Sequence, residues 1–277
     1  MLINKAVYKG ITNEVDVTEI VKSLKQDFVV NNNLFSDPEP NHRKYLCVNG
    51  TIIIKEWDTF LVDYFNKFPT TNRLGIFYTN NQIRPDILNK VLSELEKSTS
   101  KIDIITCAWE QLNNDKFYNL GSLNKNNSTH FTIVSQILQC LLLAKKYNKG
   151  YEYVSFLEHD VLYTPEHFDY KDFDENIICN MNYGGLNEFG YSNLKQSTIP
   201  LHQMTMKFDF AVEYFSAILL KYLQGEYNSV EPSFGIKIVH DKEQSIHIKH
   251  GRNFTNHYDS FSDSYNKEHT YWKNYRI

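Results

Sequence analysis

The strongest chemical signal in the sequence is the triplet Glu158-His159-Asp160, which follows a strongly apolar run at residues 151–157. That run predicts a short buried strand. Carboxylates two positions apart at a strand end can direct oxygen atoms at one divalent cation, and Mg²⁺ or Mn²⁺ accepts few carboxylates while keeping diphosphate and water ligands. An isolated acid-x-acid triplet is more often a salt-bridged strand end. Here the apolar strand favours the cation site, because burying two acids without partners is costly.

A second cluster of candidate ligands lies at residues 245–255, where His247 and His250 flank a lysine. In a strand, His247 and Lys249 point to one face and His250 to the other. The glycine that follows allows the backbone to turn, which makes His250 the better candidate for a third metal ligand or a diphosphate contact. Lys249 and Arg252 are candidates for offsetting phosphate charge. Read alone, the histidines are explained as well by packing in the core or exposure on an edge strand as by ligand binding.

A third polar cluster, Thr79-Asn80-Asn81, follows another apolar run, and Arg84 comes shortly after it. Amide side chains in this place can contact a nucleobase, and Arg84 can contact phosphate. A polar loop with asparagines in turn conformations is an equally good interpretation.

Strands and helices alternate through the central part of the chain. Strands are predicted at 73–79, 101–109 and 151–157, and helices at 85–95, 131–144 and 207–223. Strand, helix, strand predicts an α/β domain with a parallel sheet. Residues 113–127 and 173–200 are predicted to be loops. The acids at 158 and 160 then stand at the carboxyl end of a strand, where open α/β sheets bind ligands.

The amino-terminal part has a different pattern. Residues 1–56 contain short β-like runs separated by turn signals at 31–33 and 37–40, which predicts a small β module. Its V-D-V-T and N-N-x-L-F-x-D-P-x-P segments resemble a short β domain found attached to larger proteins. The predicted domains are therefore 1–56 and 57–277, the second with a carboxyl-terminal tail.

Composition narrows the class of protein. The chain has 277 residues, of which 42% are hydrophobic and 22% charged, with a net charge of −4. These values exclude wholesale disorder and give no general attraction to polyanions. The four cysteines form no C-x-x-C pair and predict buried thiols in a reducing compartment. Neither a secretion signal nor a run of about 18 apolar residues is present, so a cytoplasmic location is expected.

Taken together, four segments resemble the nucleotide-diphospho-sugar glycosyltransferases of the GT-A type, close to family 2 and to a bacterial and phage group within it. The matching segments are G-I-F-Y-T-N-N (75–81), T-I-V-S-Q-I-L (132–138), Y-V-S-F-L-E-H-D-V-L-Y-T-P-E-H-F (153–168) and I-H-I-K-H-G-R-N-F-T (246–255). The resemblance covers about residues 70–260. It implies a GT-A (Rossmann-like) mixed sheet flanked by helices, preceded by the small β domain.

The resemblance also implies roles for individual residues. Asp160 takes the place of the metal-binding aspartate of the D-x-D signature, and His250 that of a further ligand. Glu158 takes the acidic position two before Asp160; being a longer side chain, it contacts the metal directly or through water, or contacts the sugar instead. Relatives are expected to have an acidic or polar residue at position 247, so His247 is not expected to bind the metal. The residues expected to bind the nucleotide sugar are Thr79, Asn80, Asn81, Arg84, Gln136, Glu158, Lys249 and Arg252.

The catalytic base has no clear motif. A carboxylate must deprotonate the acceptor hydroxyl near the anomeric carbon, and Glu231 is preferred over Glu188 for this role, with Asp160 contributing to catalysis through the metal. Gln203 is a candidate contact for the acceptor. Seven of the ten histidines lie between residues 159 and 257. Those expected only to pack or to lie at the surface are His167, His202, His240 and His257.

The expected function is a metal-dependent transfer of a hexose or pentose from a nucleotide-diphosphate sugar, with Mn²⁺ or Mg²⁺, to a hydroxyl acceptor. The acceptor is a surface glycan or a hydroxymethylated pyrimidine in phage DNA. One alternative is a non-catalytic binding or scaffold protein with a degenerate transferase domain. Another is a nucleotidyltransferase, which would need a glycine-rich phosphate loop, and 78–81 contains no glycine.

Overall fold

The computed structural model describes a large part of the chain, in several stretches. The described residues are 3–67, 71–80, 83–98, 102–112, 114, 117–123, 129–147, 150–187, 190–193, 199–226, 229–248 and 271–272. The chain divides into two compact units. The first is formed by Met1–Asn72 with Leu142–Tyr151, and the second by Arg73–Leu141 with Glu152–Ile277. None of the helices in the described part of the chain is long and apolar enough to cross a membrane.

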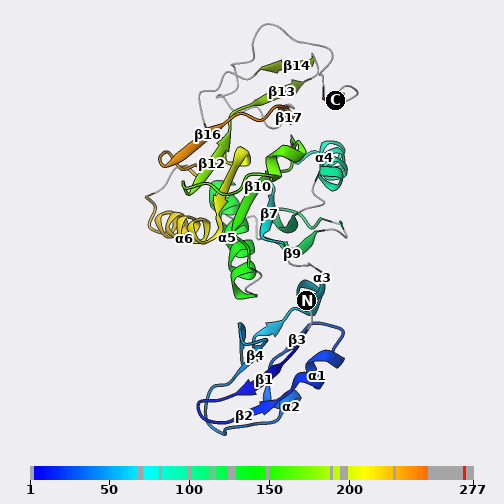
Figure 1. The fold of residues 1–277 in the computed structure, drawn as a ribbon, viewed down its shortest axis with the longest axis vertical. Coiled ribbons are helices and arrows are strands. Elements are labelled where there is room, and N and C mark those ends of the chain that lie inside the picture. Colours follow the sequence, from blue (N-terminus) through cyan, green and yellow to red (C-terminus); the bar gives the residue numbers. More distant parts are fainter. Residues whose placement is uncertain are drawn as a thin grey trace. The chain divides into compact units, whose positions relative to one another are not determined.

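The first unit is built around an antiparallel sheet of four strands in the order β2-β1-β4-β5 (Figure 1). Its strands are β1 (Ala6–Lys9), β2 (Glu14–Asp16), β4 (Tyr45–Val48) and β5 (Ile52–Lys55), with a further pair, β3 (Phe28–Val29) and β6 (Thr59–Phe60). Three short helices accompany them, α1 (Thr18–Ser23), α2 (Asn32–Phe35) and α3 (Val62–Lys67). Short strands and short helices thus make up this unit, and α1 and α2 form in runs predicted to be strands.

Aromatic packing explains why residues beyond 56 belong to this unit. The ring of Tyr147 lies 5.6 Å from that of Phe60 and 5.0 Å from that of Tyr64. Its hydroxyl also accepts a hydrogen bond from the Leu61 backbone at 2.5 Å. Tyr147 is distant in sequence, so local patterns at residues 1–56 carry no sign of it.

Glu39 fixes a turn of the same unit. Oε2 accepts hydrogen bonds from the backbone N–H groups of Ile11, Thr12 and Asn13 at 2.7, 2.9 and 3.3 Å. Oε1 accepts one from the Thr12 hydroxyl at 3.1 Å. These donors, the Thr12 backbone N–H foremost, lower the pKa of Glu39. Gly10 is required beside it, because a Cβ there would lie 2.3 Å from Oε2.

The second unit contains a mixed sheet of seven strands in the order β16-β12-β15-β10-β7-β8-β9. The strands are β7 (Arg73–Tyr78), β8 (Asp103–Ala108), β9 (Tyr118–Ser122), β10 (Tyr153–Glu158), β12 (Ile177–Asn180), β15 (Met204–Lys207) and β16 (Ile236–Val239). All run parallel to β10 except β15, which is antiparallel to both of its neighbours.

The strand order reverses between β7 and β10. From β7 the chain goes to β8 and β9 on one side and then returns to β10 on the other. Open α/β sheets bind ligands at such a reversal, outside the carboxyl ends of the two strands, because the loops there part in opposite directions. Thr79 and Glu158-His159-Asp160 occupy these two ends.

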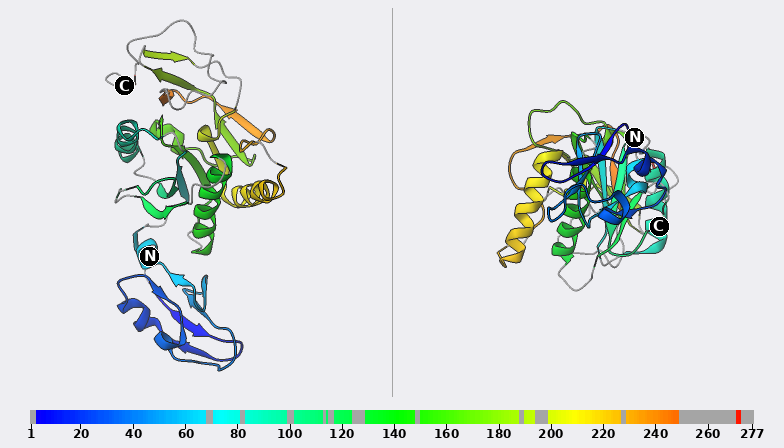
Figure 2. Two further views of the ribbon diagram at one scale, coloured as in Figure 1. Left: turned by 180° about the vertical axis from the view of Figure 1, so that it is seen from behind. Right: turned by 90° about the horizontal axis from the view of Figure 1, so that it is seen from below.

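Helices cover both faces of this sheet (Figure 2). They are α4 (Pro85–Ser98), α5 (Thr129–Lys146) and α6 (Phe208–Leu223). The apolar side of α4 packs in one core cluster with Phe77 and Leu157. Phe156, whose side chain points to the opposite face, packs against Phe215 of α6 with the ring centroids 5.2 Å apart. The rings of Phe131 and Tyr222 join α5 to α6 on that face.

A second, smaller sheet of the unit has the order β11-β17-β13-β14. Its strands are β11 (Val161–Leu162), β13 (Tyr183–Asn187), β14 (Gly190–Asn193) and β17 (Ser245–Ile248), and the 3₁₀ turns η1 (Pro165–Phe168) and η2 (Leu201–Gln203) complete the unit. β11 begins directly after Asp160, so the small sheet starts at the carboxyl edge of the large one.

The predicted α/β domain with a large mixed sheet flanked by helices is confirmed. Its strands at 73–78, 103–108 and 153–158 and its three helices lie where the hydrophobic pattern predicts them. Two predicted loops are wrong: β9 forms within 113–127, and β12, β13 and β14 form within 173–200. β9 is at the edge of the sheet and only half-buried, so its sequence lacks the apolar pattern of a strand. The four predicted buried thiols are confirmed, since Cys47, Cys107, Cys140 and Cys179 are free and buried.

Candidate functional site

Glu158, Asp160 and His247 form the centre of the candidate site. One ligand atom from each of these side chains lies within 4.8 Å of the others. Asp160 is 1% exposed and His247 5%, and Nε2 of His247 lies 3.4 Å from Oδ2 of Asp160. Two carboxylates and an imidazole are donors that Mn²⁺ accepts, whereas Mg²⁺ prefers oxygen ligands alone. These side chains therefore fit a divalent cation.

Strand pairing brings His247 to Asp160 across 87 residues of sequence. β11 pairs antiparallel with β17, and Val161 stands opposite His247. The backbone N–H of Ile248 donates to the Asp160 carbonyl at 2.8 Å. The main chain on both sides of the cluster is thereby fixed. The resemblance leaves His247 doubtful as a ligand, whereas this pairing brings it to Asp160 and makes it a ligand candidate.

His202 contacts the same cluster from another direction. Its Nδ1 lies 3.1 Å from Oε2 of Glu158, and its ring lies 5.0 Å from that of His247. The side chain is buried. The sequence predicts that His202 only packs or lies at the surface. Its one local sign of a role in the site is its position just before Gln203, a polar residue in an apolar segment.

Gln136 and Thr79 bind each other at the end of β7. The Thr79 backbone N–H donates to Oε1 of Gln136 at 3.0 Å, and Nε2 of Gln136 donates to the Thr79 carbonyl at 2.8 Å. The Thr79 hydroxyl accepts a hydrogen bond from the Trp109 backbone N–H at 2.7 Å. Both side chains are fully buried. This geometry makes them a clamp that shapes the loop after β7, rather than groups turned to a ligand.

Glu231 lies on the loop after α6 and is exposed. Its Oε2 accepts a hydrogen bond from the Ser229 hydroxyl at 2.8 Å. Burial raises the pKa of Tyr78, and the charges of Glu158, Glu231 and Asp160 raise it further. Glu231 is hydrogen-bonded within its own loop, and its role as the catalytic base stays a prediction.

The remaining predicted residues are placed as follows. Arg84 pairs with Asp86, at 2.5 Å between Nη2 and Oδ2, and its guanidinium lowers the pKa of Asp86 to about 2. Asn80 lies half-buried after Thr79. The others fall outside the described residues: Asn81, Glu188, Lys249, His250 and Arg252.

Next to the cluster lies a buried polar network around Asp241. Oδ1 accepts a hydrogen bond from the Tyr170 hydroxyl, and Oδ2 accepts one from the amide of Asn180 at 2.9 Å. The same amide lies 3.5 Å from Oε1 of Gln203, the neighbour of His202. Burial raises the pKa of Asp241 to about 6, although the Tyr170 hydrogen bond opposes this. Gln203, predicted to contact the acceptor, is fully buried and belongs to this network.

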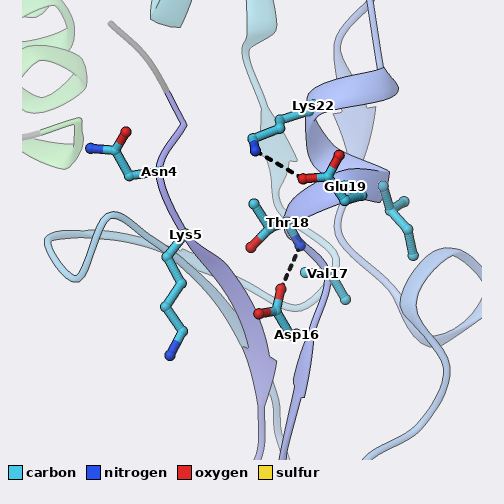
Figure 3. Close-up of a pocket in the computed structure, with 8 residues that line it drawn as sticks. Asn4, Lys5, Asp16, Val17, Thr18, Glu19 and Lys22 are labelled. Carbon is cyan, nitrogen blue, oxygen red and sulfur yellow. Dashed lines mark hydrogen bonds and ion pairs between the residues drawn. The ribbon is translucent and has the colours of Figure 1, made fainter.

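A surface depression in the first unit has a different character (Figure 3). The residues that line it are Asn4, Lys5, Asp16, Val17, Thr18, Glu19, Ile20 and Lys22. Asp16 accepts a hydrogen bond from the Thr18 backbone N–H at 2.9 Å, and Glu19 pairs with Lys22 at 2.8 Å. Asp16, Glu19 and Lys22 therefore pair with neighbours inside the depression. The candidate site is thus the cluster in the second unit.

Comparison with known proteins assigns the chain to no family. No protein-family model and no curated protein matches the chain. One solved structure that is similar is a glycosyltransferase involved in the glycosylation of the major capsid of PBCV-1, at 12% identity and a TM-score of 0.41. The alignment covers 63% of this chain and 91% of that one. At this level the likeness does not extend to activity or substrate.

Proposed function

We propose that the protein is a metal-dependent glycosyltransferase of the GT-A type that moves a sugar from a nucleotide-diphosphate sugar to a hydroxyl acceptor. The observation that carries the proposal is the buried cluster of Glu158, Asp160 and His247 at the reversal of strand order. A cluster of acids in an apolar setting is expensive unless a cation or a ligand offsets the charge. The motif resemblance of residues 153–168 points to the same chemistry.

In the proposed reaction, Glu158, Asp160 and His247 hold Mn²⁺ or Mg²⁺, with His250 as a further candidate. A cation held by these residues would supply positive charge against the negative charge that develops on the diphosphate leaving group. Glu231 takes the proton of the acceptor hydroxyl, whose oxygen bonds to the anomeric carbon as the bond from that carbon to the diphosphate oxygen breaks. Gln136 holds the backbone of Thr79, and the loop that follows, with Asn80, forms part of the nucleoside-binding site.

The test is a panel of nucleotide sugars incubated with the protein and Mn²⁺, with release of nucleoside diphosphate as the readout. Acceptors are offered in two arms, surface-type glycans and duplex DNA containing hydroxymethylated pyrimidines. Because Asp160 supplies the cation site, Asp160→Ala is expected to lower turnover by roughly 10²–10³-fold, the range seen when one stabilising group is removed. Asp174→Ala, which changes an exposed carboxylate of the same unit, is the matched control.

Turnover that survives Asp160→Ala or an excess of chelator would sink the metal mechanism. If no nucleotide sugar is turned over or raises the melting temperature, the scaffold alternative replaces this proposal.

A further inference from the structure

The position of His202 is unusual for a residue remote in sequence from the acidic triplet. A single imidazole contacts two members of the cluster, through Nδ1 to Glu158 at 3.1 Å and through its ring to His247 at 5.0 Å. The ring also meets Tyr183 edge-on at 6.0 Å. With 3% of its surface exposed, His202 is surrounded by the cluster and the small sheet.

Local structure holds His202 in this place. η2 begins after Pro200, and the Gln203 backbone N–H donates to the Pro200 carbonyl at 3.0 Å. β15 follows at once and pairs with β10, the strand that ends in Glu158. The short turn therefore delivers His202 to the carboxyl edge, one strand away from the acidic triplet.

Glu158 needs such a partner more than Asp160 does. A glutamate has one more rotatable bond than an aspartate, so binding a cation directly costs it more side-chain entropy. The Glu158 side chain is 15% exposed, against 1% for Asp160, so packing restrains it less. Hydrogen-bonding partners outside the ligand set fix the orientation of ligating carboxylates, and their loss weakens metal binding about 10–100-fold.

We propose that His202 is a positioning residue that holds the Glu158 carboxylate in a cation-binding orientation, so that Glu158 is a direct ligand beside Asp160 and His247. The inference rests on the cation site of the proposed function, but not on the sugar, the acceptor or turnover. His202 lies on η2, outside both the acidic motif and β17.

Two substitutions distinguish the contribution of the His202 nitrogen to Mn²⁺ binding from that of its ring. His202→Phe keeps a ring against His247 and Tyr183 but removes the nitrogen that faces Glu158. His202→Asn removes the ring but keeps a nitrogen on Cγ, as in histidine Nδ1. The exposed His240 provides the matched control, His240→Ala.

The measurement is Mn²⁺ binding to metal-free protein without nucleotide, followed by loss of the free Mn²⁺ signal in electron paramagnetic resonance. His202→Phe is expected to raise the Kd about 10–100-fold, whereas His202→Asn and His240→Ala stay within a few-fold of the parent protein. In a Glu158→Gln background, His202→Phe is expected to cause little further loss, because the two residues act through one contact.

Wild-type affinity in His202→Phe, or equal losses in His202→Asn and His202→Phe, would overturn the positioning role. Full additivity with Glu158→Gln would do the same. Circular dichroism of each metal-free variant confirms the fold, and if His202→Phe does not fold, a His202→Asn protein with parent affinity supports the role and one with weakened affinity opposes it. Absence of sugar transfer with the expected Mn²⁺ pattern removes the proposed reaction and leaves this inference standing.

Discussion

Two buried acidic centres of this protein satisfy their charge in opposite ways. Glu39 in the first unit accepts hydrogen bonds from three backbone N–H groups and a hydroxyl of one turn. Nδ1 of the exposed His42 lies 3.5 Å from Oε1 of Glu39. Glu158 and Asp160 in the second unit lie close to each other and to the imidazoles of His202 and His247. A carboxylate surrounded by donors stabilises a fold, whereas two neighbouring carboxylates repel and stabilise it only when a cation joins them.

The contrast distinguishes carboxylates that stabilise the fold from carboxylates that are available to bind a cation. Both centres have low exposure, so burial alone does not distinguish them. The identity of the neighbours does, because backbone N–H groups cannot be released to a ligand without unfolding the turn. Three measurements test the distinction.

The largest effect on stability is expected from neutralising the two kinds of acid. Glu39→Gln turns an amide N–H₂ toward backbone donors, so the urea midpoint of the first unit should fall clearly. Asp160→Asn removes a like charge next to Glu158, so the metal-free protein should keep or gain stability. Urea unfolding in the presence of chelator checks both signs.

Glu19→Gln is the control for the first unit, since Glu19 makes only an exposed pair with Lys22 and should change little. A strong loss of stability in metal-free Asp160→Asn would show that Asp160 is a structural acid like Glu39.

The neutral Gln136–Thr79 clamp, at the end of β7, should contribute to stability as Glu39 does. Gln136→Ala leaves the N–H and the carbonyl of Thr79 without their partner in the interior, at about 1–3 kcal/mol for each group. We expect the free energy of unfolding to fall by roughly 2–6 kcal/mol in total. Nucleotide-sugar KM should rise as the loop after β7 loses its shape.

Gln139→Ala is the control on α5, because Gln139 is exposed one turn later. Equal stability of the two variants would contradict the clamp.

The smallest effect concerns Asp241, whose surroundings lie between the two extremes. It accepts hydrogen bonds from Tyr170 and Asn180, yet burial raises its pKa from 3.8 to about 6. The folded state therefore binds this proton more tightly than the unfolded chain does. Its contribution to stability is complete below about pH 4 and is lost as the pH rises to about 6.

Asp241→Asn should flatten this part of the pH profile of unfolding, measured by chemical denaturation between these values. Glu213→Gln, an exposed change on α6, should leave the profile as in the parent. A parent profile that rises from pH 4 to pH 6 in step with the Asp241 carboxyl would reverse the assignment.

Prediction from sequence succeeded where periodicity is strong. The buried residues Ile87, Val91 and Leu95 recur on one face of α4, and β10 is apolar until Glu158. It failed for β12, β13 and β14. β12 is apolar but only four residues long, and β13 and β14 contain glycine and polar residues; neighbouring strands supply the hydrogen bonds of all three. Propensity alone cannot anticipate such tertiary pairing.

The candidate site divides in the same way. The sequence by itself determined that two carboxylates leave the end of a buried strand, because the alternation of residue types is local information. Only the tertiary structure decided which histidines lie beside them. The β11–β17 pairing brings His247 from 87 residues away, and the turn η2, just before β15, places His202 against Glu158. Contacts between distant segments depend on register and strand order, which no local pattern encodes.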